Sequence, residues 1–102
     1  MKYLLDDKIL TEWDEEKNRR NSIKHGLNFE TAELVFADRC RVEIFDEMHS
    51  VDEERYISFG KVGRTIIVVV HTLRGERNRL ISARLATKQE RQMYYEYYKK
   101  RR

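Results

Sequence analysis

The chain has 102 residues, of which 40% are hydrophobic and 11% aromatic. That is enough for one hydrophobic core and too little for two, so we expect residues 1–102 to form a single domain. Charged residues make up 38% of the chain, and their distribution is uneven: residues 1–51 hold 8 lysines and arginines against 12 acidic residues, whereas residues 52–102 hold 13 against 6. A basic half on an otherwise acidic body is typical of proteins that bind polyanions such as nucleic acid.

The same totals argue against a secreted or membrane protein. The single cysteine, Cys40, excludes an internal disulfide and indicates a reducing compartment. The longest apolar run, Ile66–Val70, is far too short to cross a bilayer. The stretch MKYLLDDKIL reaches two aspartates before a signal-peptide core can form. We therefore expect a cytoplasmic protein with no membrane association.

The first third of the chain predicts two helices, after a short strand or extended lead-in at residues 3–5 and 9–11. Residues 13–26 begin with Asp14 as an N-cap and end at Gly26. This helix is polar nearly all round, so it is either mostly solvated or meets a polar partner on one face. Residues 28–38 form the second predicted helix, with a core-facing stripe of apolar side chains three and four positions apart.

The middle of the chain predicts four β-strands at residues 41–45, 54–60, 64–72 and 78–84. The third is apolar on both faces, which favours a central position in the sheet. Gly-containing turns at residues 60–64 and 73–78 indicate antiparallel hairpins. A capping box formed by Thr87 and Glu90 then opens a C-terminal helix. The predicted fold is α+β: two N-terminal helices, an antiparallel sheet of about four strands, and a C-terminal helix.

The last predicted strand, RNRLISAR, carries three arginines. Strict alternation places Leu80, Ser82 and Arg84 on one face of the sheet, with Arg79, Ile81 and Ala83 on the other. Guanidinium groups held on a rigid sheet are suited to bidentate contacts with phosphate. The alternative, to which we give equal weight, is that Arg79 and Arg84 pair with acidic side chains of neighbouring strands, namely Glu43, Asp46 or Glu54.

Four sequence motifs together resemble the BrnT family of bacterial toxins over nearly the whole chain. They are W-D-x-x-K-x-x-x-N-x-x-K-H-G at residues 13–26, E-E-R at residues 53–55, I-S-A-R-x-A at residues 81–86, and Glu90-Arg91 ahead of Tyr94. The resemblance implies a ribonuclease toxin of a type II toxin–antitoxin system, with a fold similar to the RelE/ParE toxins. It also implies translation inhibition and a cognate protein antitoxin, usually a DNA-binding repressor. We expect a two-plus-two complex that contacts operator DNA only through the antitoxin.

RNA cleavage without a metal needs a base near the 2′-hydroxyl, cations around the phosphate, and an acid at the leaving oxygen. The candidate bases are Glu54 and His25. Arg64 and Arg84 are the candidates for stabilising charge, with Lys24 assisting. Lys24 and His25 are equally explained as cations that complement the dipole at the end of a helix.

Further side chains are candidates for binding RNA: Arg77, Arg79, His71, Trp13 and Tyr94. Aromatic rings of this kind can stack on unpaired bases. For Trp13 and the tyrosines of the last helix, however, core packing and helix docking are the favoured interpretation.

A metal site is the less favoured mechanism. Residues 46–54 supply Asp46, His49, Asp52, Glu53 and Glu54, which are enough ligands for Mg²⁺, but they have no fixed ligand spacing. We interpret them as a solvated acidic loop, or as a surface that meets a basic region of the antitoxin. The sequence thus predicts no metal and no other cofactor. Two non-enzymatic functions remain open, a plain RNA-binding module and a protein-interaction domain.

Overall fold

The computed structural model describes residues 9–101, and the possible strand at residues 3–5 lies outside this range. The fold is α+β, with a five-stranded mixed sheet in the order β1-β5-β4-β3-β2. The strands are β1 (Leu10–Glu12), β2 (Val42–Phe45), β3 (Arg55–Val62), β4 (Thr65–Arg74) and β5 (Arg77–Leu85). The helices are α1 (Glu15–His25), α2 (Phe29–Ala32) and α3 (Lys88–Arg101), with 3₁₀ turns η1 (Glu33–Ala37) and η2 (Glu47–His49).

The α+β class, the C-terminal helix and the four predicted strands, now β2 to β5, are confirmed, and β4 is central as expected. The prediction of about four antiparallel strands was wrong in one respect, because β1 adds a fifth strand that runs parallel to β5. The prediction of two N-terminal helices also needs correction. The strand β1 precedes them, and the second helix is a single α-turn, α2, continued by the 3₁₀ turn η1.

Amide side chains fix the polar helix α1 to the sheet. This agrees with the interpretation that one face of the helix meets a polar partner. Asn21 lies buried beside β5. Its Nδ2 donates to the backbone oxygens of Leu27 and Ala83, both at 2.8 Å, and its Oδ1 accepts from the Ala83 N–H at 3.0 Å. The side chain thus pairs with β5 as a neighbouring strand would, beyond the point where the three-residue β1 has ended.

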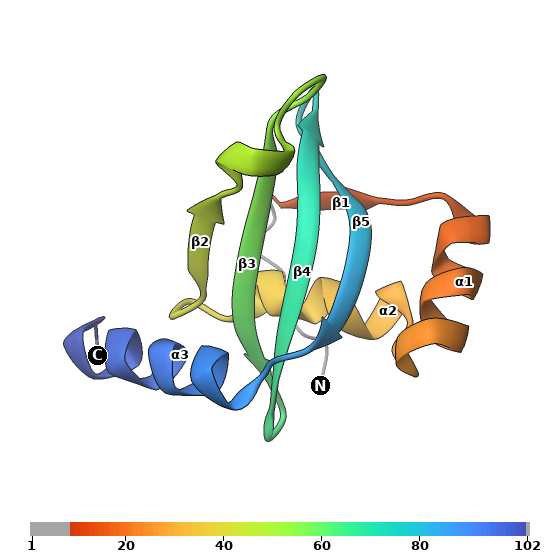
Figure 1. The fold of residues 1–102 in the computed structure, drawn as a ribbon. Helices are drawn as coiled ribbons and strands as arrows, with labels where there is room; N and C mark the ends of the chain where they lie inside the picture. The colour runs from red at the N-terminus through yellow and green to blue at the C-terminus, as the bar shows by residue number, and fades with distance from the viewer. Residues whose placement is uncertain (1–8, 102) are drawn as a thin grey trace.

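Apolar side chains cover both faces of the sheet, to different extents. On one face, here called the covered face, α2 and η1 pack across the strands with Phe29, Val35 and Leu80 in the core. On the other, here called the open face, α3 lies against one end of the sheet, where Tyr94 packs with Phe59. Figure 1 shows α2 behind the sheet and α3 in front of its lower end. No helix within residues 9–101 combines the length and apolar character needed to cross a membrane.

A β-bulge in β5 changes which side chains share a face. Val70 pairs with Ser82 and the next residue, His71, pairs with Leu80, so Ile81 is an extra residue in the strand. Strict alternation had placed Leu80 and Ala83 on opposite faces, and this was wrong: both are buried in the core of the covered face. The bulge therefore turns Arg84 to the same face as Arg79, the open face.

Candidate functional site

Five arginines lie on the open face or at its rim: Arg55, Arg74, Arg77, Arg79 and Arg84. The register of the three central strands sets this arrangement, because Arg55 pairs with Thr72 and Thr72 pairs with Arg79. All three side chains project to one side of the sheet. The sequence segment Arg77–Arg84 thus holds its three arginines on one face, and β3 and β4 contribute two more.

Three carboxylates, Glu12, Glu53 and Glu90, lie beside these cations, and each of the first two lies beside two of them. Glu12 of β1 accepts from Arg79 Nη1 at 2.8 Å and lies 3.9 Å from Arg77 Nε. Glu53 lies 3.8 Å from Arg55 and 3.7 Å from Arg74. The Nε of Arg55 is buried and, among the residues that the structure describes, has no hydrogen-bond partner. Arg79 pairs with an acidic side chain of a neighbouring strand, but the predicted partners Glu43, Asp46 and Glu54 were wrong. Its partner is Glu12 on β1, the strand that corresponds to the possible strand at residues 9–11.

Arg84 is held by a bidentate ion pair with the first turn of α3. Its two terminal nitrogens donate to the two carboxylate oxygens of Glu90 at 2.7 and 2.9 Å. Glu90 also accepts from the Thr87 N–H, which completes the predicted capping box. The Arg84 hydrogen bonds are the main reason that the pKa of Glu90 falls to about 2, and the same pair raises the pKa of Arg84. The guanidinium is fixed in position while 42% of its side chain stays exposed.

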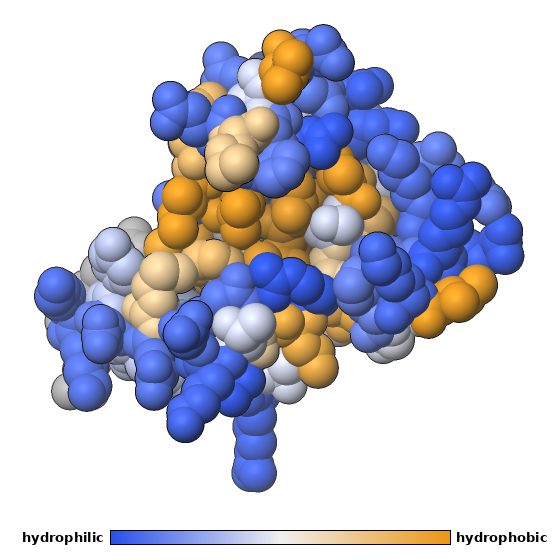
Figure 2. All heavy atoms as spheres, viewed as in Figure 1, coloured by the Kyte–Doolittle hydropathy of each residue, from blue (hydrophilic) through white to orange (hydrophobic). Residues whose placement is uncertain are grey.

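An apolar strip on the open face separates Arg84 from the other four arginines. It consists of Ile44, Ile57 and Val70, which are neighbours across β2, β3 and β4. Figure 2 shows this hydrophobic surface uncovered above α3. Thr72, next to Arg79, and Val68, next to Arg84, are four residues apart on β4, or about 13 Å along the strand. The face thus offers cations at both ends of an apolar floor, which suits the phosphates and bases of a single-stranded nucleic acid.

The predicted catalytic residues are not all brought together. Glu54 lies just before β3, whereas Arg64 is exposed in the turn after it. The eight residues of β3 separate them, a span of about 26 Å. Lys24 and His25 occupy the exposed last turn of α1, as their helix-end interpretation describes. Of the predicted site residues, Arg77, Arg79 and Arg84 share the open face.

The two aromatic candidates are held within the fold. The Trp13 ring meets Phe29 edge-on at 6.0 Å between centroids, and its Nε1 donates to Glu15 at 2.8 Å. Tyr94 is 1% exposed, and its hydroxyl donates to Asp38 Oδ2 at 2.5 Å. Burial, followed by this hydrogen bond, raises the pKa of Tyr94. Both side chains agree with the core-packing interpretation.

His71 is also inaccessible, since it is 1% exposed on the covered face. Its ring nitrogens lie 2.7 Å from Ser58 Oγ and 2.9 Å from Asn78 Oδ1. Burial is the main cause of the lowered pKa of His71 and favours the neutral ring. Its place in the structure is that of a satisfied core residue.

The acidic loop does not gather its ligand-type side chains. Within residues 9–101, no three His, Cys, Asp or Glu side chains lie close enough together to hold a metal ion. His49 instead contacts Asp46, with Nδ1 2.9 Å from Oδ2.

Sequence reasoning missed the carboxylates that hold the arginines. The possible strand at residues 9–11 stopped one residue short of Glu12 and had no predicted neighbour in the sheet, and Glu90 was interpreted only as part of a helix cap. Arg55 shares the open face with Ile57 and Phe59, but its position beside Arg79 depends on the register of two hairpins, which no local pattern reveals.

The fold and the open face together define a small α+β protein with a surface suited to a polyanion. A sequence profile described as "Ribonuclease toxin, BrnT, of type II toxin-antitoxin system" matches residues 13–90, which is more than half of the chain. The chain therefore belongs to the BrnT family of ribonuclease toxins, and this membership implies a protein antitoxin as partner. No match was found among curated proteins.

Proposed function

We propose that this toxin is a metal-independent endoribonuclease whose RNA-binding site is the open face. In this proposal, RNA cleavage in the cytoplasm inhibits translation, and a cognate DNA-binding antitoxin neutralises the toxin in a two-plus-two complex. The observation that carries the proposal is the bulge at Ile81, which collects Arg77, Arg79 and Arg84 on one exposed surface. Membership of a ribonuclease family supports the reaction class.

The chemistry that fits such a surface is internal transesterification. A base removes the proton of a ribose 2′-hydroxyl, and that oxygen attacks the adjacent phosphorus. The bond from phosphorus to the 5′-oxygen breaks, and that oxygen takes up a proton, leaving 2′,3′-cyclic phosphate and 5′-hydroxyl ends. One of Arg79 and Arg84 would bind the non-bridging oxygens of the scissile phosphate, where negative charge grows in the transition state. The other, about 13 Å along the strand, would bind another phosphate of the RNA.

Two candidates for the base remain. Glu54 borders the covered face, because the Tyr56 hydroxyl that bonds it belongs to a ring stacked on His71. Glu54 is exposed beside Arg55, accepts a hydrogen bond from the Tyr56 hydroxyl at 2.9 Å, and makes no ion pair among the described residues. By contrast, Glu12, Glu53 and Glu90 are all ion-paired. His25, with Lys24 before it, ends the helix whose Asn21 bonds β5 next to Arg84. If Glu54 is the base, Arg64 takes no part in the reaction, because it stands one strand length away.

The decisive experiment is cleavage of purified single-stranded RNA with and without EDTA, followed by analysis of the new ends. We expect EDTA-resistant cleavage with 2′,3′-cyclic phosphate and 5′-hydroxyl ends. Sensitivity to EDTA would contradict the mechanism. RNA that is bound but left intact, both free and on translating ribosomes, would favour the binding module.

Matched substitutions test whether the open face is the site. Arg79→Gln and Arg84→Gln should both lower the cleavage rate. The substitution at the scissile phosphate should lower it by about 10²-fold, the usual effect of removing one donor to a developing charge. Arg20→Gln makes the same charge change on α1, where the side chain is 70% exposed, and should leave the rate unchanged. Glu54→Gln and His25→Gln then separate the two bases, because the true base controls the acid limb of the pH–rate profile.

A further inference from the structure

The outer edge of β2 is a free strand edge in the part of the chain that the structure describes. The backbone N–H of Asp46 donates to the Arg55 oxygen at 2.8 Å. Because hydrogen-bonded pairs alternate along an antiparallel ladder, Ile44 and Val42 also bond toward β3. The backbone N–H and C=O groups of Glu43 and Phe45 consequently point away from the sheet. Within residues 9–101, no other strand or side chain takes up these groups.

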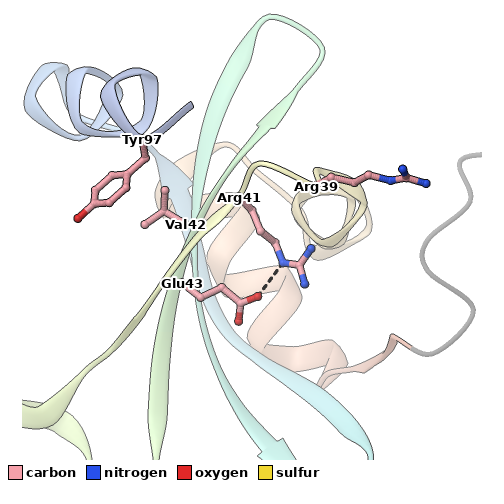
Figure 3. Close-up of a pocket in the computed structure, with 5 residues that line it drawn as sticks. All are labelled: Arg39, Arg41, Val42, Glu43 and Tyr97. Atoms are coloured by element: carbon pink, nitrogen blue, oxygen red, sulfur yellow. Dashed lines mark hydrogen bonds and ion pairs between the residues drawn. The ribbon is translucent and has the colours of Figure 1, made fainter. Parts of the chain in front are cut away.

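A groove runs along this free edge. It has a volume of about 490 Å³ and is lined by Arg39, Arg41, Val42 and Glu43 on one side and by Tyr97 of α3 on the other. Figure 3 shows the Tyr97 ring beside Val42, with the β2 backbone between Val42 and Glu43 at the edge. A strand added to β2 would lie in this groove, between the edge and the C-terminal half of α3.

Large apolar side chains are concentrated on the same segment. Ile44 is 40% exposed, Phe45 46%, Met48 85% and Val51 85%. An exposed edge strand without proline, lysine or bulge, and with apolar side chains on both faces, is a template for pairing with another strand. These features indicate that another strand pairs with β2, and the charges around β2 indicate which strand that is.

The segment around β2 has opposite charges at its two ends. Arg39 and Arg41 precede the strand, whereas Asp46 and Glu47 follow it. When such a segment pairs with a copy of itself in antiparallel orientation, the basic end of each copy meets the acidic end of the other. Unlike charges opposite each other stabilise a pair of strands, and like charges destabilise it.

We propose that β2 is a homodimerisation edge, at which two copies of this chain join their sheets through antiparallel β2–β2 pairing. The two-fold register that uses all four outward backbone groups of Glu43 and Phe45 sets Glu43 opposite Phe45 of the second copy. Ile44 then faces Ile44 of the second copy across the two-fold axis, and Arg41 faces its Glu47. The result is a continuous ten-stranded sheet.

The helix α3 provides a second complementary contact. Figure 1 shows α3 extending past β2 beyond the edge of the sheet. In the proposed register, Val42, which shares the groove with Tyr97, faces Asp46 of the second copy. Lys100 follows Tyr97 by three residues and so projects from the same side of α3. The basic end of α3 in each copy therefore lies beside the acidic loop, residues 46–54, of the other.

A site-specific cross-link tests the register. At the two-fold axis the Cα atoms of the two Ile44 residues would be about 4.5 Å apart, within the range of roughly 4.4–6.8 Å found in disulfides. Ile44→Cys in a Cys40→Ser background should form a disulfide-linked dimer rapidly under mild oxidation. Ile23→Cys in the same background is the control, because Ile23 is 74% exposed on α1 and should cross-link slowly by random collision. Equal rates for the two variants would overturn the proposal.

Sedimentation velocity of the unmodified toxin provides an independent test that needs no variant to fold. We expect concentration-dependent dimerisation at micromolar levels, weakened at high salt. Glu43→Pro removes an outward N–H without touching the bonds to β3, a change that edge strands tolerate. It should abolish the dimer and keep the far-ultraviolet circular dichroism spectrum. A toxin that stays monomeric at all concentrations, with Ile44 protected only by the antitoxin, would assign this edge to the antitoxin and contradict the proposal.

Discussion

The two faces of the sheet carry polar side chains in opposite ways. On the covered side of the sheet, buried polar groups bond to other parts of the protein: Asn21 of α1 to the edge of β5, and His71 to Ser58 and Asn78. On the open face the arginines are partly exposed, and carboxylates at the rim, such as Glu12 and Glu90, hold them in place. Buried polar groups must be satisfied for the chain to fold, whereas exposed ion pairs contribute little to stability.

The difference separates residues that build the domain from residues available to a ligand. Substitutions on the covered face should lower the free energy of unfolding with no specific effect on RNA. Substitutions on the open face should change RNA binding and cleavage at nearly constant stability. The predictions below test this separation, starting with the largest effect.

Asn21→Ala should destabilise the protein most. It leaves the N–H and C=O of Ala83 and the C=O of Leu27 without their partners in a buried setting. We expect the free energy of unfolding to fall by about 3 kcal/mol, measured by urea denaturation. Gln92→Ala, at an exposed position on α3, is the control and should stay within about 0.5 kcal/mol of wild type. A loss below about 1 kcal/mol for Asn21→Ala would mean that α1 is not anchored by this amide.

Gly60→Ala tests the packing of η1 on the covered face. A Cβ at Gly60 would lie 2.6 Å from Val35 Cγ1 and 3.0 Å from the Val35 oxygen. Overpacking of this kind should destabilise the protein by about 2 kcal/mol. Val35→Ala in the Gly60→Ala background removes the methyl contact, so it should cost less than the sum of the two single changes. Strict additivity in this double-mutant cycle would contradict the predicted clash.

Features that depend on neighbouring residues in the sequence could be predicted, whereas features that depend on contacts between distant residues could not. The four long strands and the cap at Thr87 follow from local patterns, and both were predicted. The bulge at Ile81 could not be, because alternation is a local rule and the bulge depends on how β5 fits β4. Arg79 and Arg84 were identified as phosphate-binding candidates but placed on opposite faces for this reason. The partner of Asn21 is 62 residues away, and no local pattern reveals it.

The pH dependence of stability should also report on the covered face. Because burial lowers the pKa of His71, the unfolded chain binds its proton more tightly than the folded protein does. The contribution is fully present above the unfolded pKa of about 6.5 and is lost as the pH falls toward the lower folded value. Stability should rise with pH in that window by up to about 1.4 kcal/mol per pH unit. His71→Gln should flatten this rise in urea titrations, whereas His25→Gln, at an exposed histidine, should keep it.

Glu90→Gln should have the smallest effect on stability. It tests both the stability of the open face and its binding of RNA. Gln can still cap α3, so the variant removes mainly the charge that faces Arg84. Since this pair lowers the pKa of Glu90 from 4.5 to about 2, its stabilisation is present above pH 4.5 and is lost as the pH falls toward 2. For a partly exposed pair we expect a loss of about 1 kcal/mol at pH 7, and less acid sensitivity in the variant.

The same substitution should strengthen RNA binding several-fold at low salt, because it frees Arg84 for phosphate and removes a repelling carboxylate. Filter binding at two salt concentrations measures this gain, which should shrink as salt screens the charges. The matched variant Glu96→Gln makes the same charge change at an exposed position of α3 and should have a smaller effect. If Glu90→Gln instead weakens RNA binding, the ion pair serves to position Arg84 rather than to compete with RNA for it.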